Sequence, residues 1–540
     1  MGVEKGSRFA VENYLAECLR LEEEFVHPPK AKLLLVSQSP MGEEIGARDI
    51  AISSALQCYA PGTAAMTIRP EKKYQEIADS TLYAGHHTTR MHLYYTFLIE
   101  GASRDVTHDV LHIHPFYNTS QQSQRYVEAK EGNYLEPAKL TEQQREIYLE
   151  SAKEANRNYF KLLALLGPEV ESRLRLMYPK GSYQNSRAAE RLETKSQKLC
   201  QEIARYVLPI AQKTNLYYTV NELQLLRMFR ASQLPNYSKE ARLITAKMVQ
   251  EVAEFDEQIM ADLEEPFPEI KRDDFNEVYI RQQKKEFDFQ LSERQSQLIL
   301  SPHNSREKLA LAVRNVLGVS ERNLSDSEAL LFLMDPNNNQ LLADVYEVGM
   351  MDPLTNCLRE VSFTNVTKLS HTADSQRQRQ RRTPGATPPI AAVYDGRADY
   401  ITPLIIREDS ELNEQFELMM ANSYRNVERC IESGIPKDWA LLLLPNAHTL
   451  RVVESGDLFD WFHRFKQRLC FLAQEEIFFI TTEQAEQTIE VLPEAELMFL
   501  APCGLRKSSS LSPRCPEGER WCGQAVFNMG IEEYKKMRLI

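Results

Sequence analysis

A spaced pattern of residues occurs twice along this chain, and it restricts the possible folds more than any other feature. Its core is Ala-Arg-x-x-Leu-Pro at 204–209 and Ala-Leu-x-x-Leu-Pro at 440–445. Two further positions follow, sixteen and then eleven residues on: Asn221 and Ser232 in the first copy, Asp457 and Arg468 in the second. Such agreement is typical of internal duplication. We therefore expect two copies of one fold, because 540 residues are too many for a single core.

Hydrophobic periodicity and capping signals predict the elements of each half. In the first half we expect helices at 8–25, 189–206, 220–230 and 238–263, strands at 32–37 and 93–99, and a long helix from Thr141 that stops at Gly167-Pro168. In the second half we expect helices at 305–318, 410–433 and 456–475, with an irregular arginine-rich loop at 375–389. Turn-forming residues make that loop unsuitable for a helix or a central strand.

The charged, proline-bearing segment 264–274 is the expected linker between the halves. It divides the chain into an N-terminal helical extension (1–29), a first repeat (30–263), a second and more divergent repeat (275–500) and a cysteine-containing C-terminal segment (501–540).

Composition narrows the classes of function. A net charge of −13 argues against a general nucleic-acid surface, so a phosphate-bearing partner would need a local group of arginines, and a small anion in a pocket is the natural candidate. No apolar run approaches the roughly 18 residues of a membrane span, and the first residues lack the apolar core of a secretory signal. Nine cysteines, most of them scattered, indicate reduced thiols in a cytoplasmic protein.

The segment Ser-Gln-Gln-Ser-Gln-Arg-Tyr at 120–126 is dense in hydroxyl, amide and guanidinium groups. Ser123 would supply a hydroxyl donor and Arg125 a fork of donors, a pairing suited to phosphate oxygens. The same composition also fits a polar surface loop.

Together with neighbouring elements, this segment resembles the signature of the flavin-dependent thymidylate synthases. The first half also carries Gly85-His86, similar to that family's Gly-His element, and the Ala-Arg-x-x-Leu-Pro element with an asparagine sixteen residues after its arginine. The resemblance implies an α+β fold in which an antiparallel sheet is flanked by long helices. It also implies substrate-binding residues (Gln122, Ser123, Arg125, Tyr126 and Arg205) and FAD-binding residues (His86, Thr88, His112, His114 and Asn221).

The first half departs from the family pattern at two points. His112-Ile113-His114 stands where the family has Arg-His-Arg, and Ser232 stands where the family has an arginine that binds the substrate pyrimidine. The first half alone is therefore an incomplete site.

The second half has the reverse pattern, because its element at 440–445 has lost the arginine while Arg468 occupies the substrate-arginine position. Arg468 also lies on or beside an apolar stripe formed by Leu458, Trp461, Phe465, Leu469 and Leu472. A buried guanidinium needs a carboxylate or a ligand. We assign Arg468 as the catalytic arginine; a structural salt bridge or a side chain that reaches solvent is the alternative.

Two alignments are open for the arginine-rich loop. In one, Arg379-Gln380-Arg381 corresponds to the family's Arg-His-Arg, which would make Arg379 and Arg381 FAD-binding residues. In the other, the Ser-Gln-Arg at 375–377 corresponds to the Ser-Gln-Arg at 123–125. A solvated basic loop is the alternative to both.

Cys503, Cys515 and Cys522 crowd the end of the chain beside glycine and proline, but no C-x-x-C pair is present, so we assign no metal. His86, His92 and His108 lack a ligand-like pairing and are better explained as partners of backbone or cofactor groups.

The family's enzymes are homotetramers whose active sites lie between subunits, and reduced flavin passes the methylene of a folate to uracil. The resemblance therefore implies an FAD-dependent transfer of methylene to dUMP or a related pyrimidine nucleotide, with NADPH and methylene-tetrahydrofolate as co-substrates. We expect composite sites from both repeats and a homodimer that acts as a pseudo-tetramer, without nucleic-acid or membrane partners. The alternative is a non-catalytic or repurposed protein that binds flavin or nucleotide.

Overall fold

A computed structural model describes residues 8–37, 47–57, 71–178, 186–268, 270 and 277–540. Two four-stranded antiparallel sheets are present in this part of the chain, with the same strand order. The first is β1 (Lys30–Val36), β2 (Tyr94–Ser103), β4 (Lys213–Asn221) and β3 (Tyr117–Gln121); the second is β5 (Ser296–Leu300), β6 (Ser362–Ser370), β8 (Thr449–Asp457) and β7 (Gly385–Ala386). We call the parts of the chain built around them the first and second repeats.

Helices surround both sheets and connect them. The first repeat has α1 (Arg8–Arg20), α2 (Ala47–Gln57), α3 (Glu71–Tyr83), α4 (Arg104–Val106), α5 (Glu142–Met177), α6 (Ser186–Ala204), α7 (Glu222–Arg230), α8 (Lys239–Phe255) and α9 (Ile259–Asp262). The second has α10 (Glu277–Leu291), α11 (Ser305–Leu317), α12 (Asp326–Met334), α13 (His371–Arg377), α14 (Ile390–Val393), α15 (Leu404–Arg407), α16 (Ser410–Glu432), α17 (Lys437–Leu441), α18 (Leu458–Arg468) and α19 (Glu475–Val491), followed by α20 (Pro502–Ser508) and α21 (Ile531–Met537).

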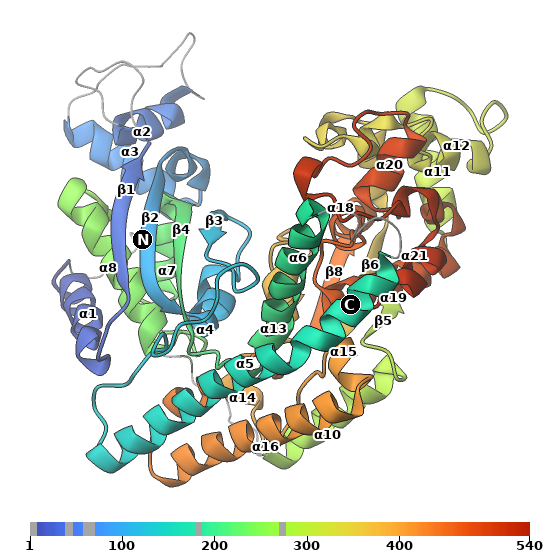
Figure 1. Cartoon of the computed structure of the whole chain (residues 1–540). Helices are drawn as coiled ribbons and strands as arrows, with labels where there is room; N and C mark the ends of the chain where they lie inside the picture. Colours follow the sequence, from blue (N-terminus) through green and yellow to red (C-terminus); the bar gives the residue numbers. More distant parts are fainter. Residues whose placement is uncertain (1–7, 38–46, 58–70, 179–185, 269, 271–276) are drawn as a thin grey trace.

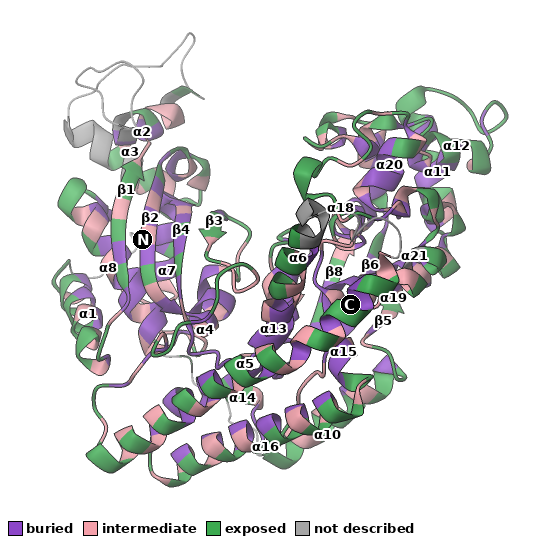
Figure 2. Cartoon of the chain, viewed as in Figure 1, coloured by how far each residue is buried: buried purple, intermediate pink, exposed green. Residues whose placement is uncertain are grey.

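The sheets lie in two arms, and the long helices α5 and α16 run side by side at their base (Figure 1). Buried residues concentrate on the inner strands and on the helix faces turned toward them (Figure 2). No helix in the described ranges has the length and apolar character that crossing a membrane requires.

Equivalent residues perform the same local task in both repeats. Ser103 caps α4 and Ser370 caps α13, and each serine also donates to a buried glutamate, Glu240 or Glu476, over 2.6 Å. Asn221 and Asp457 cap α7 and α18 through their side-chain oxygens. The duplicated spacing in the sequence therefore reflects a duplicated architecture.

The repeats meet around Pro209 and Pro445, which face each other in an antiparallel bridge. Four backbone hydrogen bonds cross here in two symmetric pairs. Ile210 N donates to Leu444 O (2.9 Å) as Asn446 N does to Leu208 O (2.8 Å); Ala211 N donates to Leu442 O (2.7 Å) as Ala447 N does to Tyr206 O (2.8 Å). A local pseudo-twofold axis therefore relates the repeats.

Four element predictions were wrong. The predicted helix 238–263 ends at Phe255, and the separate short helix α9 follows. The long helix does not stop at Gly167-Pro168 but continues to Met177, because Leu162, Leu166, Val170 and Leu174 keep one buried stripe while Pro168 is exposed. The predicted helix 456–475 is divided into α18 and α19 by a turn at 469–474, whose carbonyls accept from arginines outside these helices. The loop 375–389 is partly regular, since its start lies in α13 and Gly385–Ala386 form β7.

Candidate functional site

The inter-repeat site forms where the end of β2 faces the end of β6 across the pseudo-twofold axis. His108 of the first repeat stacks on His371 of the second at 3.8 Å, and its Nδ1 lies 2.6 Å from Asp374 Oδ2. Residues 107–111 form a π-helical turn here, a distortion that occurs frequently at functional sites.

Four arginines from both repeats approach one another at this junction. We call Arg104, Arg205, Arg379 and Arg468 the arginine cluster; Arg104 and Arg205 are buried, Arg468 is partly buried and Arg379 is exposed. None of the four forms an ion pair with a carboxylate among the described residues. Among the residues that the structure describes, the guanidinium of Arg104 bonds the Gln122 carbonyl (2.8 Å), and that of Arg468 bonds the amide oxygen and carbonyl of Gln376 (3.2 and 2.9 Å).

The electrostatics of the cluster favour an anionic ligand. Burial, together with the charges of Arg205 and Arg379, lowers the pKa of Arg104 to about 9. Burial and the charges of Arg379, Arg464 and Arg125 lower the pKa of Arg468 to about 9 as well. Since an arginine stays protonated at neutral pH in proteins, these shifts express positive charge that no neighbour compensates. A phosphate or another anion would compensate it.

Unused hydrogen-bonding atoms lie in the same place. Arg104 Nε, Arg205 Nη2 and Arg468 Nε are buried without a partner among the residues described, and so are the amide nitrogens of Gln124 and Gln376. Buried polar atoms are normally satisfied. Both repeats thus supply donors suited to an anionic, hydrogen-bonding ligand.

The 120–126 segment borders the cluster. Arg125 pairs with Glu202 and donates to Leu472 O of the second repeat (2.8 Å), so it joins the segment to the turn between α18 and α19. The Ser123 hydroxyl accepts from Arg125 N (3.2 Å) and stays partly exposed, and Gln122 holds Arg104 through its carbonyl. Tyr126 is 60% exposed, at the edge of the site.

The structure distinguishes the two alignments of the arginine-rich loop. Because Ser103 and Ser370 are equivalent caps, counting on from each of them aligns 112–114 with 379–381. Ser375 and Arg377 lie on α13 directly after β6, whereas Ser123 and Arg125 follow β3, so the alignment of 375–377 with 123–125 is wrong.

A pocket of about 90 Å³ lies between the repeats, beside the cluster. Its walls include His112, His114, His371, Gln378 and Arg381. Burial lowers the pKa of His112 to about 3 and that of His114 to about 4, so both rings are neutral at pH 7. The Nε2 atoms of His112 and His371 are buried without a partner among the described residues, and Arg381 lies 4.9 Å over the Tyr117 ring. The pocket thus has an aromatic wall and free hydrogen-bonding atoms.

The predicted residues His86, Thr88 and Asn221 lie elsewhere. His86 and Thr88 are exposed in the segment before β2, and Asn221 pairs with Tyr94 at the start of that strand. The arginine cluster lies at the opposite end of β2, after Ser103. Asn221 Oδ1 caps α7 by accepting from Gln224 N (2.8 Å). Within one chain, these three residues are not brought to the other predicted ones.

Sequence reasoning missed Arg104 and Gln376. Arg104 directly follows the N-cap serine at the end of β2, and Gln376 stands three residues before Arg379, but neither position is marked by the duplicated pattern. Their roles depend on contacts between segments far apart in the chain.

On the other side of the pseudo-twofold axis, the positions equivalent to Arg104, Arg205 and Arg468 carry no arginine. Leu441 replaces Arg205, His371 replaces Arg104, and Ser232 replaces Arg468. The Ser232 hydroxyl is bonded to Tyr14 of α1 (2.9 Å). The charged donors are therefore concentrated on one side.

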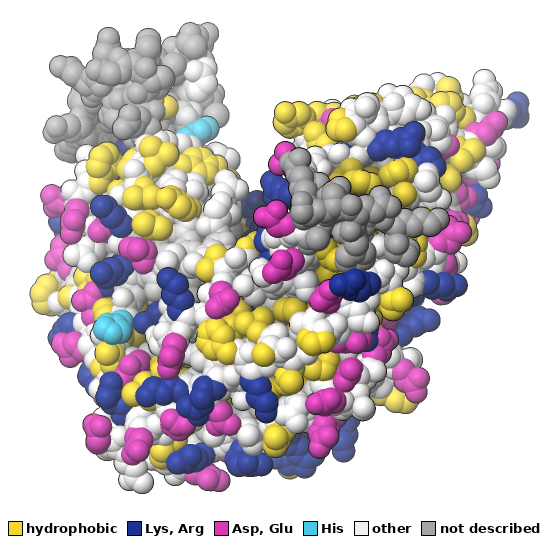
Figure 3. All heavy atoms as spheres, viewed as in Figure 1, with side chains coloured by type: hydrophobic (Ala, Val, Ile, Leu, Met, Phe, Trp, Pro, Cys, Tyr) yellow, Lys and Arg dark blue, Asp and Glu magenta, His cyan; other side chains and the backbone are white. Residues whose placement is uncertain are grey.

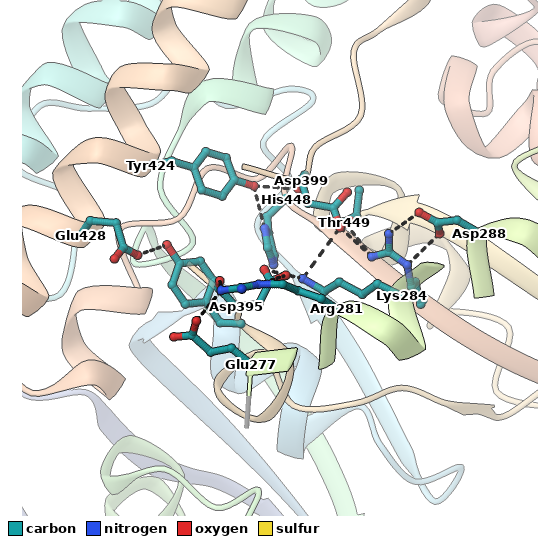
Figure 4. Close-up of polar contacts among 12 residues, drawn as sticks. Glu277, Arg281, Lys284, Asp288, Asp395, Asp399, Tyr424, Glu428, His448 and Thr449 are labelled. Atoms are coloured by element: carbon teal, nitrogen blue, oxygen red, sulfur yellow. Dashed lines mark hydrogen bonds and ion pairs between the residues drawn. The ribbon is translucent and has the colours of Figure 1, made fainter. Parts of the chain in front are cut away.

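A second charged group joins α10 to β8 and to the loop that carries Asp395 and Asp399, and its charges are paired with one another. Arg451 bonds Asp288 (2.7 and 2.8 Å) and Asp399 (2.6 Å), and Lys284 bonds Asp395 (2.9 Å), as Figure 4 shows for the acidic residues and Lys284. Because its charges are compensated internally, this group has the character of a structural clamp.

Neither a basic track on the face that Figure 3 shows nor a metal-binding group is found in the parts of the chain that the structure describes. On the face shown in Figure 3, Lys and Arg are interspersed with Asp and Glu and form no continuous basic track for a nucleic-acid backbone. In the described part of the chain, no three or more His, Cys, Asp or Glu side chains are grouped as a metal site would require, and this includes Cys503, Cys515 and Cys522.

Comparison with known proteins identifies relatives of both repeats. The profile of the family described as "Thymidylate synthase complementing protein" matches residues 42–256 and 341–494. The flavin-dependent thymidylate synthase of Clostridium tetani is 28% identical over 225 residues, which are 41% of this chain and 82% of the relative. That of Sulfurisphaera tokodaii is 28% identical over 222 residues, 40% of this chain and 72% of the relative.

One solved structure is also similar, the UMP/dUMP methylase PolB from Streptomyces cacaoi bound with 5-Br dUMP. It is 16% identical, covers 44% of this chain and 97% of its own, and has a TM-score of 0.31. The family profile matches more than half of the chain, in both repeats. The chain belongs to the flavin-dependent thymidylate synthase family.

Proposed function

We propose that this protein is an FAD-dependent enzyme that transfers a methylene group from folate to dUMP or a related pyrimidine nucleotide, at a site shared by both repeats. The observation that carries the proposal is the arginine cluster, because it gathers uncompensated charge from both repeats around unused donors. Family membership supports the reaction class.

The nucleotide phosphate would be bound by Arg104, Arg205 and the 122–125 segment, where guanidinium forks and a serine hydroxyl converge. Tyr126 would line the entrance. Arg468 would face the uracil ring and stabilise negative charge that develops on a ring carbonyl, which a preorganised cation does best in a buried site. Gln376 holds that guanidinium in place through two hydrogen bonds.

The pocket beside the cluster offers hydrogen-bonding atoms for one edge of a flavin ring, since its volume of about 90 Å³ is smaller than a whole cofactor site. The unpartnered Nε2 atoms of His112 and His371 would bond ring nitrogens or carbonyls, and Arg379 and Arg381 would bind the anionic parts of FAD. When bound, the reduced flavin supplies the electrons and carries the one-carbon unit, so no protein nucleophile is required. His86 and Thr88, which are exposed, would contribute from a second copy, which favours a homodimer, whereas buried Asn221 would hold the start of α7.

Spectroscopy and turnover test this function. Purified protein, reconstituted with FAD if necessary, should absorb near 450 nm, and its reduced flavin should be oxidised in a manner that depends on both dUMP and methylene-tetrahydrofolate. NADPH is the expected reductant. Protein that binds no flavin would overturn the enzyme proposal. Flavin binding without dUMP-dependent turnover would favour the alternative of a repurposed flavin- or nucleotide-binding protein.

Calorimetry tests the shared site. Because the charged donors lie on one side of the pseudo-twofold axis, one dUMP should bind per chain. Arg468→Ala of the second repeat and Ser123→Ala of the first should each weaken dUMP binding, by at least tenfold for the arginine. Arg157→Ala, which removes an exposed arginine paired with Glu150, is the control and should bind normally. Normal affinity in either site variant would contradict a shared site.

A further inference from the structure

Tyr206 is a buried tyrosine of the first repeat whose hydroxyl reaches into the second. It is 1% exposed, donates to Glu476 and accepts from the side-chain amide of Gln474. Gln474 ends the turn at 469–474 and is the N-cap of α19, and Glu476 lies in the first turn of that helix. The hydroxyl is therefore a cross-link between the repeats in the interior of the protein.

The turn that Tyr206 contacts holds three parts of the proposed nucleotide site. Leu472 O accepts from Arg125 (2.8 Å), and Gln474 N donates to the amide oxygen of Gln376 (3.4 Å). The same Gln376 oxygen accepts from Arg468 (3.2 Å). A continuous series of hydrogen bonds thus leads from the tyrosine hydroxyl to the guanidinium of Arg468.

The pseudo-twofold axis provides an internal comparison. Glu240 is the equivalent of Glu476, and each glutamate accepts from the backbone nitrogen and hydroxyl of its serine over 2.6–2.7 Å. The contact between glutamate and serine is therefore common to both repeats. Leu442, however, is the equivalent of Tyr206, and Ser238 is the equivalent of Gln474, so the hydroxyl cross-link is absent opposite. It is present on the side that carries the arginine cluster.

We propose that Tyr206 is a positioning residue, which fixes the turn 469–474 and so holds Gln376, Arg125 and Arg468 in the geometry that binds the nucleotide. The inference rests on the function proposed above. It predicts that the hydroxyl contributes to ligand affinity through Arg468, beyond any contribution to stability.

The test is calorimetric binding of dUMP to the full chain, with thermal unfolding measured in parallel. Tyr206→Phe should weaken dUMP binding by roughly tenfold, the loss of about one hydrogen bond to a charged group. Tyr424→Phe is the matched control, since its buried hydroxyl bonds Asp399 O and His448 Nδ1 (both 2.7 Å) away from the cluster; it should bind dUMP normally. Gln474→Met, which removes the amide partner of the tyrosine, should act in the same direction as Tyr206→Phe.

A double-mutant cycle separates positioning from general destabilisation. In an Arg468→Lys background, which cannot keep both bonds to Gln376, Tyr206→Phe should change dUMP affinity less than twofold. Equal losses in the two backgrounds, or wild-type affinity of Tyr206→Phe, would overturn the inference while the proposed function stands. A wild-type protein that binds no dUMP would overturn the proposed function and this inference with it.

Discussion

Arg104 is buried and Arg468 is partly buried, and neither guanidinium forms an ion pair with a carboxylate among the described residues. Any anion that fits should therefore stabilise the folded protein, because binding to the native state alone shifts the unfolding equilibrium. We expect dUMP at about 100 times its dissociation constant to add about 2.7 kcal/mol to the free energy of unfolding, and inorganic phosphate to act more weakly. Thermal unfolding measures both effects. An equal increase in Arg468→Ala would contradict binding at the cluster.

Glu240 makes stability depend on pH. Burial raises its pKa to about 8, although the Ser103 hydrogen bonds act in the opposite direction. The folded protein thus keeps a proton that the unfolded chain releases above about pH 4.3, so this contribution to stability is complete below that pH and is lost as the pH rises through about 8. Glu240→Gln mimics the protonated group and should reduce the fall in melting temperature between pH 5 and pH 8. Exposed Glu150→Gln should leave the pH dependence unchanged, and an unaltered slope in Glu240→Gln would disprove the assignment.

Residue types and spacing were enough to find Arg125, Arg205 and Arg468, which the structure brings to one junction. They were not enough to find Arg104 or Gln376, whose importance comes from contacts across the pseudo-twofold axis. The same limit explains His86 and Thr88, which follow the family's order along the chain but lie at the far end of the first sheet. Spacing along the chain identifies candidate residues, whereas the tertiary fold determines which of them lie close together.

At the scale of elements, α5 shows how packing overrides a local stop signal. Gly167 lies inside this helix, and a Cβ built there would have no heavy atom within 4 Å. Gly167→Ala should therefore raise the free energy of unfolding by about 0.5–1 kcal/mol, the difference in helix propensity. Gly318→Ala is the contrasting control, because Gly318 ends α11 at φ +66°, where a side chain is strained. Thermal unfolding followed by circular dichroism should show opposite shifts; destabilisation by Gly167→Ala would contradict a continuous helix.

The paired charges of Arg451, Asp288 and Asp399 allow a second prediction at the scale of elements. Burial alone would raise the pKa of Asp399, yet neighbouring Arg451 holds it below its ordinary value. Arg451→Met would leave Lys368 as the main remaining cation beside Asp288 (3.0 Å) and Asp399 (3.3 Å). We expect the free energy of unfolding to fall by about 2–3 kcal/mol. This is less than for a fully buried pair, because the Asp288 side chain is 38% exposed. Tryptophan fluorescence during urea unfolding can follow it, since Trp439, Trp461 and Trp521 all lie in the C-terminal half. A loss below 0.5 kcal/mol, the scale of a surface pair, would exclude the clamp.

At the scale of the whole molecule, the two repeats share their interior. The apolar core around Trp439 and Leu444 includes Phe25, Tyr148 and Ile210 of the first repeat, and the Phe25 and Trp439 rings pack edge to face at 5.2 Å. With the four symmetric backbone bonds beside Pro209 and Pro445, this core makes the repeats one folding unit. Duplication could be predicted from spacing, but this shared interior could not, because period and composition do not reveal which apolar faces meet. The homodimer and the cytoplasmic location expected from the sequence stay predictions.

A shared interior has a consequence for the separated halves. Residues 1–268 and 277–540, expressed alone, should each expose the apolar surface that faces the other and should aggregate or bind a hydrophobic dye. Expressed together, they should co-purify and bind dUMP, because the contacts at Pro209 and Pro445 do not require the covalent linker. A first half with Ser123→Ala, paired with an intact second half, should co-purify and yet bind dUMP more weakly. If the first half alone were monodisperse and bound dUMP with full affinity, the arginine from the second repeat would be dispensable, and the site would not be shared.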